Sequence, residues 1–102
     1  MKEYDVFVPL YYNDGQPIEA AKFQELQKRL LERFQGLTFF PQPNQGYWKL
    51  GDISYRDEIV IYRVINEDAA SSRDFLNSLK DYLKKELRQH EILIIEREIG
   101  LL

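Results

Sequence analysis

The sequence contains no cysteine and only one histidine, His90, and these two scarcities exclude several kinds of site. Without thiols the chain forms no disulfide, iron–sulfur cluster or thiolate zinc site. A transition-metal site at His90 would need further nitrogen or sulfur ligands, and only carboxylates remain to join it. We therefore expect neither a metal nor a cofactor.

Long apolar runs and basic stretches are also missing. No segment approaches the roughly 20 apolar residues needed to cross a bilayer, and the first residues lack the apolar core of a signal peptide. The net charge is −3 at pH 7, whereas nucleic-acid binding normally needs a basic surface. We expect a cytoplasmic protein that binds neither membranes nor nucleic acids.

What the sequence does contain is the pattern of one globular domain over residues 1–102, with 44% hydrophobic and 30% charged residues. Apolar residues recur with alternating or helical spacing in six segments, in the order β-α-β-β-α-β. This order predicts the ferredoxin-like α+β fold, a four-stranded antiparallel sheet with the first and third strands central and both helices on one face. The expected strands are 4–12, 37–41, 55–65 and 91–98, and the expected helices are 17–35 and 72–89.

Several boundaries follow from individual residues. Pro41 and Pro43 cannot donate to a sheet ladder, so they are expected to end the second strand and to place it at an edge. Gly36 is expected to end the first helix, because glycine is common after the last helical residue. Ser71 and Asp74 fit a capping box at the start of the second helix.

The third and fourth strands are apolar on both faces. Apolar or aromatic residues occur in both alternating sets of the third strand, at positions 59–62, 64 and 65, and residues 92–95 form a continuous apolar run. A sheet with helices on one face and water on the other should alternate instead. A second subunit would cover the open face, and we expect a homodimer. The alternative is that residues 41–54 fold back over the sheet of their own chain.

Four short motifs carry a resemblance to a known family: residues 34–38 (Phe-Gln-Gly-Leu-Thr), 46–48 (Gly-Tyr-Trp), 56–58 (Arg-Asp-Glu) and 89–91 (Gln-His-Glu). Over about residues 15–97 the chain resembles small bacterial ferredoxin-like domains of unknown function. Many of these domains are exported, whereas this chain shows no signal peptide. More distantly, the architecture is similar to the dimeric α/β-barrel group, which includes cofactor-free monooxygenases, haem-degrading enzymes and binding modules. The resemblance implies a fold without implying a reaction.

The candidates for a ligand site or an interface cluster between positions 46 and 62. They are Tyr47, Trp48, Arg56, Glu58 and Tyr62. Any pocket is expected at the connection between the second and third strands and at the start of the third strand. Trp48, the only tryptophan, either lines a ligand pocket or packs in the core or an interface, and packing is the commoner use.

Arg56, Glu58 and Tyr62 alternate along the third predicted strand, so they share one face of the sheet. If Ile59 and Ile61 face the helices, that shared face is the open one. A desolvated Glu58 there would have a raised pKa and could act as a general base. The commoner role is a structural ion pair with a neighbouring arginine, Arg56 or Arg63.

Two function classes remain. The first is a non-catalytic domain that associates through its open sheet face and binds a small molecule or a protein partner. The alternative is a cofactor-independent enzyme of the dimeric α/β-barrel type, with Glu58 or His90 as proton carrier and with Trp48 and Tyr62 beside the substrate. An RNA-recognition module shares the order of elements, but residues 55–64 lack its aromatic and basic strand motif.

Overall fold

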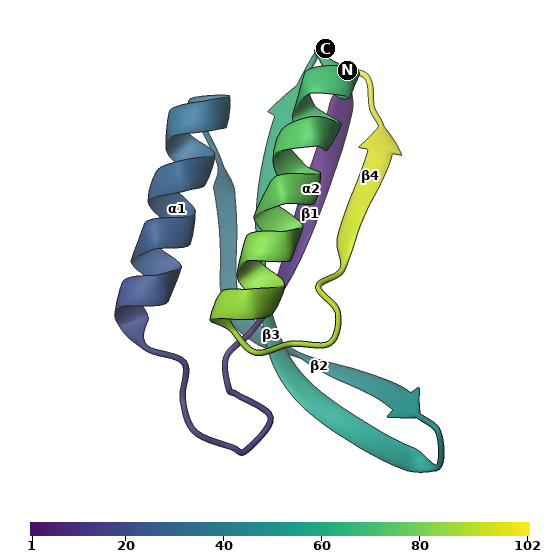
Figure 1. The fold of residues 1–102 in the computed structure, drawn as a ribbon. Helices are drawn as coiled ribbons and strands as arrows, with labels where there is room; N and C mark the ends of the chain where they lie inside the picture. The colour runs from purple at the N-terminus through teal and green to yellow at the C-terminus, as the bar shows by residue number, and fades with distance from the viewer.

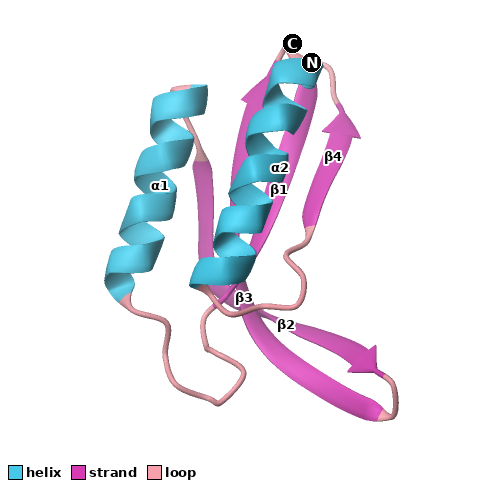
Figure 2. Cartoon of the chain, in the orientation of Figure 1, coloured by secondary structure: helices cyan, strands magenta, loops and turns pink.

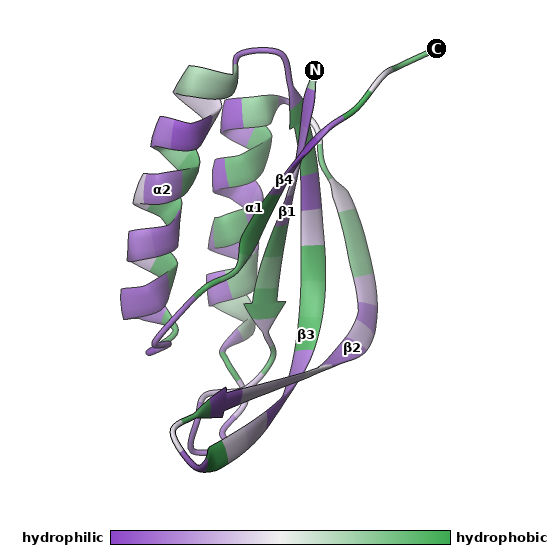
Figure 3. Ribbon diagram, turned by 90° about the vertical axis from the view of Figure 1, so that its right-hand side faces the viewer, coloured by the Kyte–Doolittle hydropathy of each residue, from purple (hydrophilic) through white to green (hydrophobic).

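The computed structural model describes all residues 1–102. Four strands form one antiparallel sheet in the order β2-β3-β1-β4, and both helices lie on the same face of it (Figure 1, Figure 3). The fold is therefore the predicted ferredoxin-like α+β arrangement, with the first and third strands in the centre. Its elements are β1 (Lys2–Pro9), α1 (Ala20–Phe34), β2 (Thr38–Leu50), β3 (Ile53–Asn66), α2 (Ala69–Glu86) and β4 (Ile94–Glu98).

The core is a cluster of 16 buried residues between the helices and the sheet. The helices supply leucines at helical spacing, among them Leu26 and Leu30 of α1 and Leu79 and Leu83 of α2. The two central strands supply alternate, even-numbered residues, which are paired across the strands: Tyr4 with Val64, Val6 with Tyr62, and Val8 with Val60.

This register decides which face each residue of β3 occupies. Val60, Tyr62 and Val64 face the helices, so Ile59 and Ile61 face away from them. The placement of Tyr62 on the open face was therefore wrong, and its side chain is a core residue with 2% exposure. The alternation along the strand was predicted correctly, but both alternating sets are apolar, so the sequence did not say which set was inside.

The strand β2 is much longer than the predicted 37–41, and β3 is slightly longer than the predicted 55–65. Together they form a hairpin that projects from the rest of the molecule (Figure 1, Figure 2). We call residues 44–58 of this hairpin the arm. Pro41 and Pro43 were expected to end β2, but a bulge between Phe40 and Asn44 accommodates them, and pairing resumes beyond it. The edge position of β2 is as expected, and the turn at the tip contains Gly51 with φ +60°.

The first helix ends one residue earlier than the sequence suggested. Its last residue is Phe34, and the left-handed conformation expected of Gly36 falls on Gln35, with φ 63°. The backbone N–H of Gln35 donates to the carbonyl of Leu31, which closes the last turn. The helix begins at Ala20, three residues after the predicted start.

The second helix also begins elsewhere. Its N-cap is Asp68, whose carboxylate accepts a hydrogen bond from the backbone N–H of Ser71 at 3.0 Å. The helix therefore starts at Ala69 rather than at residue 72, and Ser71 lies inside its first turn instead of capping it with Asp74. Neither α1 nor α2 is long and apolar enough to cross a membrane.

Candidate functional site

An apolar band crosses the sheet on the face away from the helices. Phe7 of β1 pairs with Ile61 of β3, and Ile61 pairs with Phe40 of β2. On the other side of Phe7 lies Leu93, whose carbonyl accepts a hydrogen bond from the Phe7 N–H at 3.0 Å. Phe40 and Leu93 are 36% and 52% exposed. The band thus runs across the whole width of the sheet, and no segment of the chain covers it.

The same face continues along the arm. Trp48 pairs with Tyr55, and Leu50 pairs with Ile53 at the tip, all in the alternating set that contains Ile59. The tip residues Leu50 and Ile53 are 50% and 58% exposed. Residues 41–54 were expected to cover the sheet if no second subunit did so. They instead form the arm, which bends towards the helix side of the sheet and leaves the open face uncovered (Figure 3).

Trp48 is held in place within the arm. Its ring stacks on Tyr55 with centroids 4.3 Å apart, and its Nε1 donates to a carboxylate oxygen of Asp57 at 2.7 Å. Gly46 lies beside this group, and a Cβ there would come within 2.6 Å of Cδ1 of Ile59. Trp48 therefore packs on its own arm, on the open side of the sheet, and takes no part in the core.

A group of charged residues, Glu3, Asp5, Arg63 and Arg97, lies beside the apolar band on the same face. Asp5 is only 2% exposed, and its two carboxylate oxygens accept hydrogen bonds from Arg63 at 2.8 and 3.0 Å and from Arg97 at 2.7 Å. Burial by itself would raise the pKa of Asp5, but the hydrogen bonds and charges of the two arginines outweigh it, and the pKa is lowered. Glu3 completes the group at 3.1 Å from Arg63 and 3.4 Å from Arg97. The group has two charges of each sign, so it adds no net charge to the open face.

A cleft lies between the arm and the loop that follows β1. Its volume is about 320 Å³, and its walls are Tyr11, Tyr12, Asn13 and Gly15 from the loop and residues 55–58 from β3. Arg56 and Glu58 belong to the alternating set of β3 that faces the helices, so they point away from the apolar band. The start of the third strand was the expected place for a pocket, whereas the Tyr11–Gly15 wall was not expected.

Glu58 makes none of the predicted ion pairs. Arg63 lies on the other face of the sheet and pairs with Asp5 and Glu3, and neither Arg56 nor Glu58 has a hydrogen bond or an ion pair through its side chain. The other candidates lie apart. Tyr62 is in the core, and Tyr47 is 71% exposed on the arm, in the alternating set opposite to that of Trp48.

His90 does not join Glu58. It is exposed in the connection between α2 and β4 and does not line the cleft. Histidine, aspartate and glutamate side chains nowhere gather in groups of three that could hold a metal ion.

No family model matches this chain, and no curated protein matches it either. Solved structures do. A phage SAM lyase in complex with S-methyl-5'-thioadenosine superposes with a TM-score of 0.73 at 12% identity, over 95% of this chain and 80% of the other. A phage SAM lyase in its apo state gives a TM-score of 0.72 at 14% identity, over 95% of this chain and 79% of the other. A mutant of CutA1 from Pyrococcus horikoshii OT3 gives 0.62 at 12% identity, over 100% and 86%. The likeness is one of fold.

Proposed function

We propose that this protein is a small non-catalytic binding domain whose copies associate through the open face of the sheet, in the simplest case as a homodimer. The observation that carries the proposal is the apolar band from Leu93 to the tip of the arm, which nothing in the chain covers. Monomeric soluble proteins rarely leave a contiguous apolar surface of this kind in water.

A second copy is the partner that this surface fits best. A two-fold axis would place apolar band against apolar band, because an isologous contact joins the same patch of both subunits. The charged group around Asp5 is internally neutralised, so two copies would not repel each other there. A free two-stranded hairpin is at most marginally stable in water, and the partner would support the arm by covering Trp48 and Tyr55.

The alternative is a cofactor-independent enzyme. Two observations favour it. The fold is shared with a SAM lyase, and Glu58, a half-buried carboxylate without a partner, lines the cleft. His90 does not contribute to that cleft. The purified protein should be incubated with SAM and analysed by chromatography for S-methyl-5'-thioadenosine. If the wild type forms S-methyl-5'-thioadenosine and Glu58→Gln does not, the protein is an enzyme. If SAM stays unchanged, the binding domain remains the proposed function.

The test of association is the mass of the protein in solution. Sedimentation equilibrium at tens of micromolar should give at least twice the 12.2 kDa of one chain. Leu93→Lys and Ile61→Lys each place a charge on the apolar band and should shift the protein towards monomer. Gln27→Lys, on the exposed side of α1, is the matched control and should keep the wild-type mass.

Circular dichroism of each variant establishes that the fold is intact, and Leu93 is exposed enough for its substitution to be tolerated in a monomer. A wild-type protein that sediments as a monomer at high micromolar concentration would refute the proposal. So would two folded lysine variants that associate as strongly as the wild type.

A further inference from the structure

The cleft beside the arm contains two side chains of opposite charge that have no partner. Arg56 and Glu58 line it from the same face of β3, two residues apart, so their Cα atoms are separated by about 7 Å. They do not pair with each other or with any other residue. Glu58 is half-buried and Arg56 is exposed, so both charges are accessible to a ligand that enters the cleft.

The third charged residue of the wall is already engaged. Asp57 belongs to the opposite alternating set of β3, and its carboxylate accepts the hydrogen bond from Nε1 of Trp48. The charged side chains of the wall that have no partner are therefore one guanidinium and one carboxylate. Such a pair matches a molecule that carries one anionic and one cationic group.

The opposite wall is aromatic and is fixed by its own hydrogen bonds. The Tyr12 N–H donates to the carbonyl of Gln16 at 2.8 Å, and the Gly15 N–H donates to the carbonyl of Tyr12 at 2.9 Å. The side chain of Asn13 donates to the carbonyl of Arg88 at 3.4 Å, which ties the loop to the segment just after α2. A wall that is ordered before binding reduces the entropy lost when a ligand enters.

The two tyrosines of this wall differ in whether their side chains already have partners. The hydroxyl of Tyr12 is used by Glu19 and Lys22, and the guanidinium of Arg88 lies 4.8 Å from the centre of its ring. Tyr11 is 42% exposed, and its hydroxyl has no hydrogen bond. Tyr11 therefore offers a free aromatic surface next to the two unpaired charges.

We propose that this cleft binds a small zwitterion, namely a free α-amino acid with an aromatic or large apolar side chain. Glu58 accepts hydrogen bonds from the ammonium group, Arg56 donates to the carboxylate, and the side chain lies against Tyr11. The volume of about 320 Å³ is at the lower end of the range of about 300–1,000 Å³ for ligand sites, as a molecule of this size requires. The site goes beyond the proposed association and does not depend on it, because Arg56 and Glu58 face away from the apolar band.

Three matched ligands test the two charged contacts one at a time. Phenylalanine carries both charged groups, phenethylamine lacks the carboxylate, and 3-phenylpropionate lacks the ammonium. Isothermal titration calorimetry with up to millimolar ligand should show that phenylalanine binds about tenfold or more tightly than either analogue, as expected for one charged hydrogen-bonded contact.

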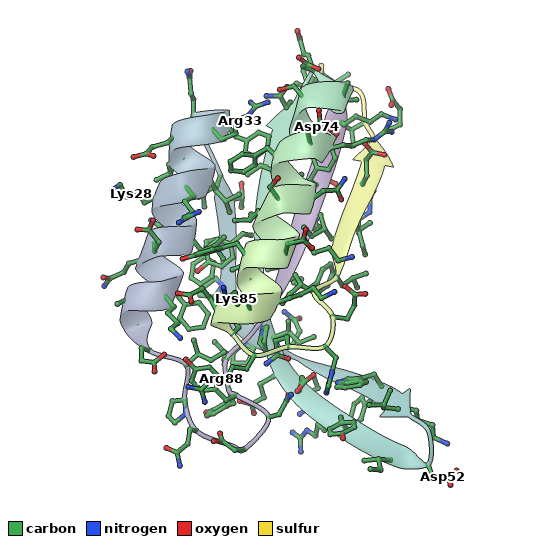
Figure 4. All side chains as sticks on the ribbon, viewed as in Figure 1. Lys28, Arg33, Asp52, Asp74, Lys85 and Arg88 are labelled. Carbon is green, nitrogen blue, oxygen red and sulfur yellow. The ribbon has the colours of Figure 1, made fainter.

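Two substitutions then assign the contacts. Glu58→Gln should weaken phenylalanine about tenfold and leave 3-phenylpropionate unchanged. Arg56→Met should weaken phenylalanine to a similar degree and leave phenethylamine unchanged. Lys28→Met, which removes a charge on the outer side of α1 (Figure 4), should bind all three like the wild type.

The mass of each variant, measured alongside, should equal that of the wild type, so a failure of binding is distinguished from a failure of association. Absence of binding by phenylalanine would overturn the proposal. Equal binding of phenylalanine and phenethylamine would also overturn it, as would phenylalanine affinities that neither substitution changes.

Discussion

Asp5 is the residue whose replacement should most clearly separate structural charge from surface charge. Asp5→Asn keeps the shape of the side chain but removes the negative charge between Arg63 and Arg97. It also places an amide N–H₂ group, which is a donor, against guanidinium groups that can only donate. The two arginines would then be left close to each other without the carboxylate that joins them.

The magnitude follows from the burial of each partner. Removal of one member of a fully buried ion pair costs about 3–5 kcal/mol. Asp5 is buried, but the side chains of Arg63 and Arg97 are 33% and 43% exposed, so water screens them after the substitution. We therefore expect the free energy of unfolding to fall by about 2–4 kcal/mol. Urea denaturation at one fixed protein concentration measures it.

The dependence on pH provides the second readout. The pKa of Asp5 is lowered in the folded protein, and in the unfolded chain it is about 3.9. The stabilisation is fully present above the unfolded-state pKa and is lost as the pH falls through the folded-state pKa. Wild type and Asp5→Asn should therefore differ most near neutral pH and converge in strong acid.

The matched control is Glu98→Gln, because Glu98 forms an ion pair with Lys2 at a surface site where its own side chain is 67% exposed. It should change stability very little. If Asp5→Asn were as stable as Glu98→Gln at pH 7, the carboxylate would contribute nothing beyond an ordinary surface charge, and the reasoning would be refuted.

Three further substitutions test local features. Asp68→Ala removes the cap of Ser71 at the start of α2 and should lower the free energy of unfolding by about 1 kcal/mol in urea denaturation; no change would mean that the cap is not formed in solution. Gly51→Ala places a Cβ on a residue with φ +60° and should cost about 1–2 kcal/mol by the same measurement, whereas a neutral result would contradict the turn at the tip of the arm. Gly46→Ala should be better tolerated in an Ile59→Val background, which lacks the Cδ1 atom that lies 2.6 Å from the added Cβ; a double-mutant cycle without coupling would contradict that contact.

The order of elements and the sheet topology could be predicted because they depend on local patterns. The leucines at positions 26, 30, 79 and 83 have the helical period, and the strands alternate, so the sequence alone indicates β-α-β-β-α-β. The length of the arm could not be predicted in the same way. The β2 strand of the arm contains Gly46 and follows two prolines. Its extended form depends on pairing with residues of β3, which no local pattern indicates.

The candidate site was predictable only in part. Arg56 and Glu58 were found because they are charged residues at the start of an apolar strand, and both line the cleft. The opposite wall was not predicted, because Asn13-Asp14-Gly15 indicates only a turn and gives no sign of what lies opposite. Asp5 was missed, although an isolated acid in an apolar strand was a visible signal, because its pairing with Arg63 requires the register of the two strands.

The position of β1 has a consequence for the order in which the molecule is completed. Of the four strands this one is synthesised first, yet it lies in the centre of the sheet, between residues 59–66 on one side and residues 94–98 on the other. One edge of β1 therefore stays unpaired until β4 has emerged, and contacts between residues so distant in sequence form slowly. At the end of this process the N–H of Ile99, just after β4, reaches the carbonyl of Met1 at 3.1 Å. Completion of the sheet thus depends on the shortest strand in the molecule, and its most buried strand is the last to gain both of its neighbours.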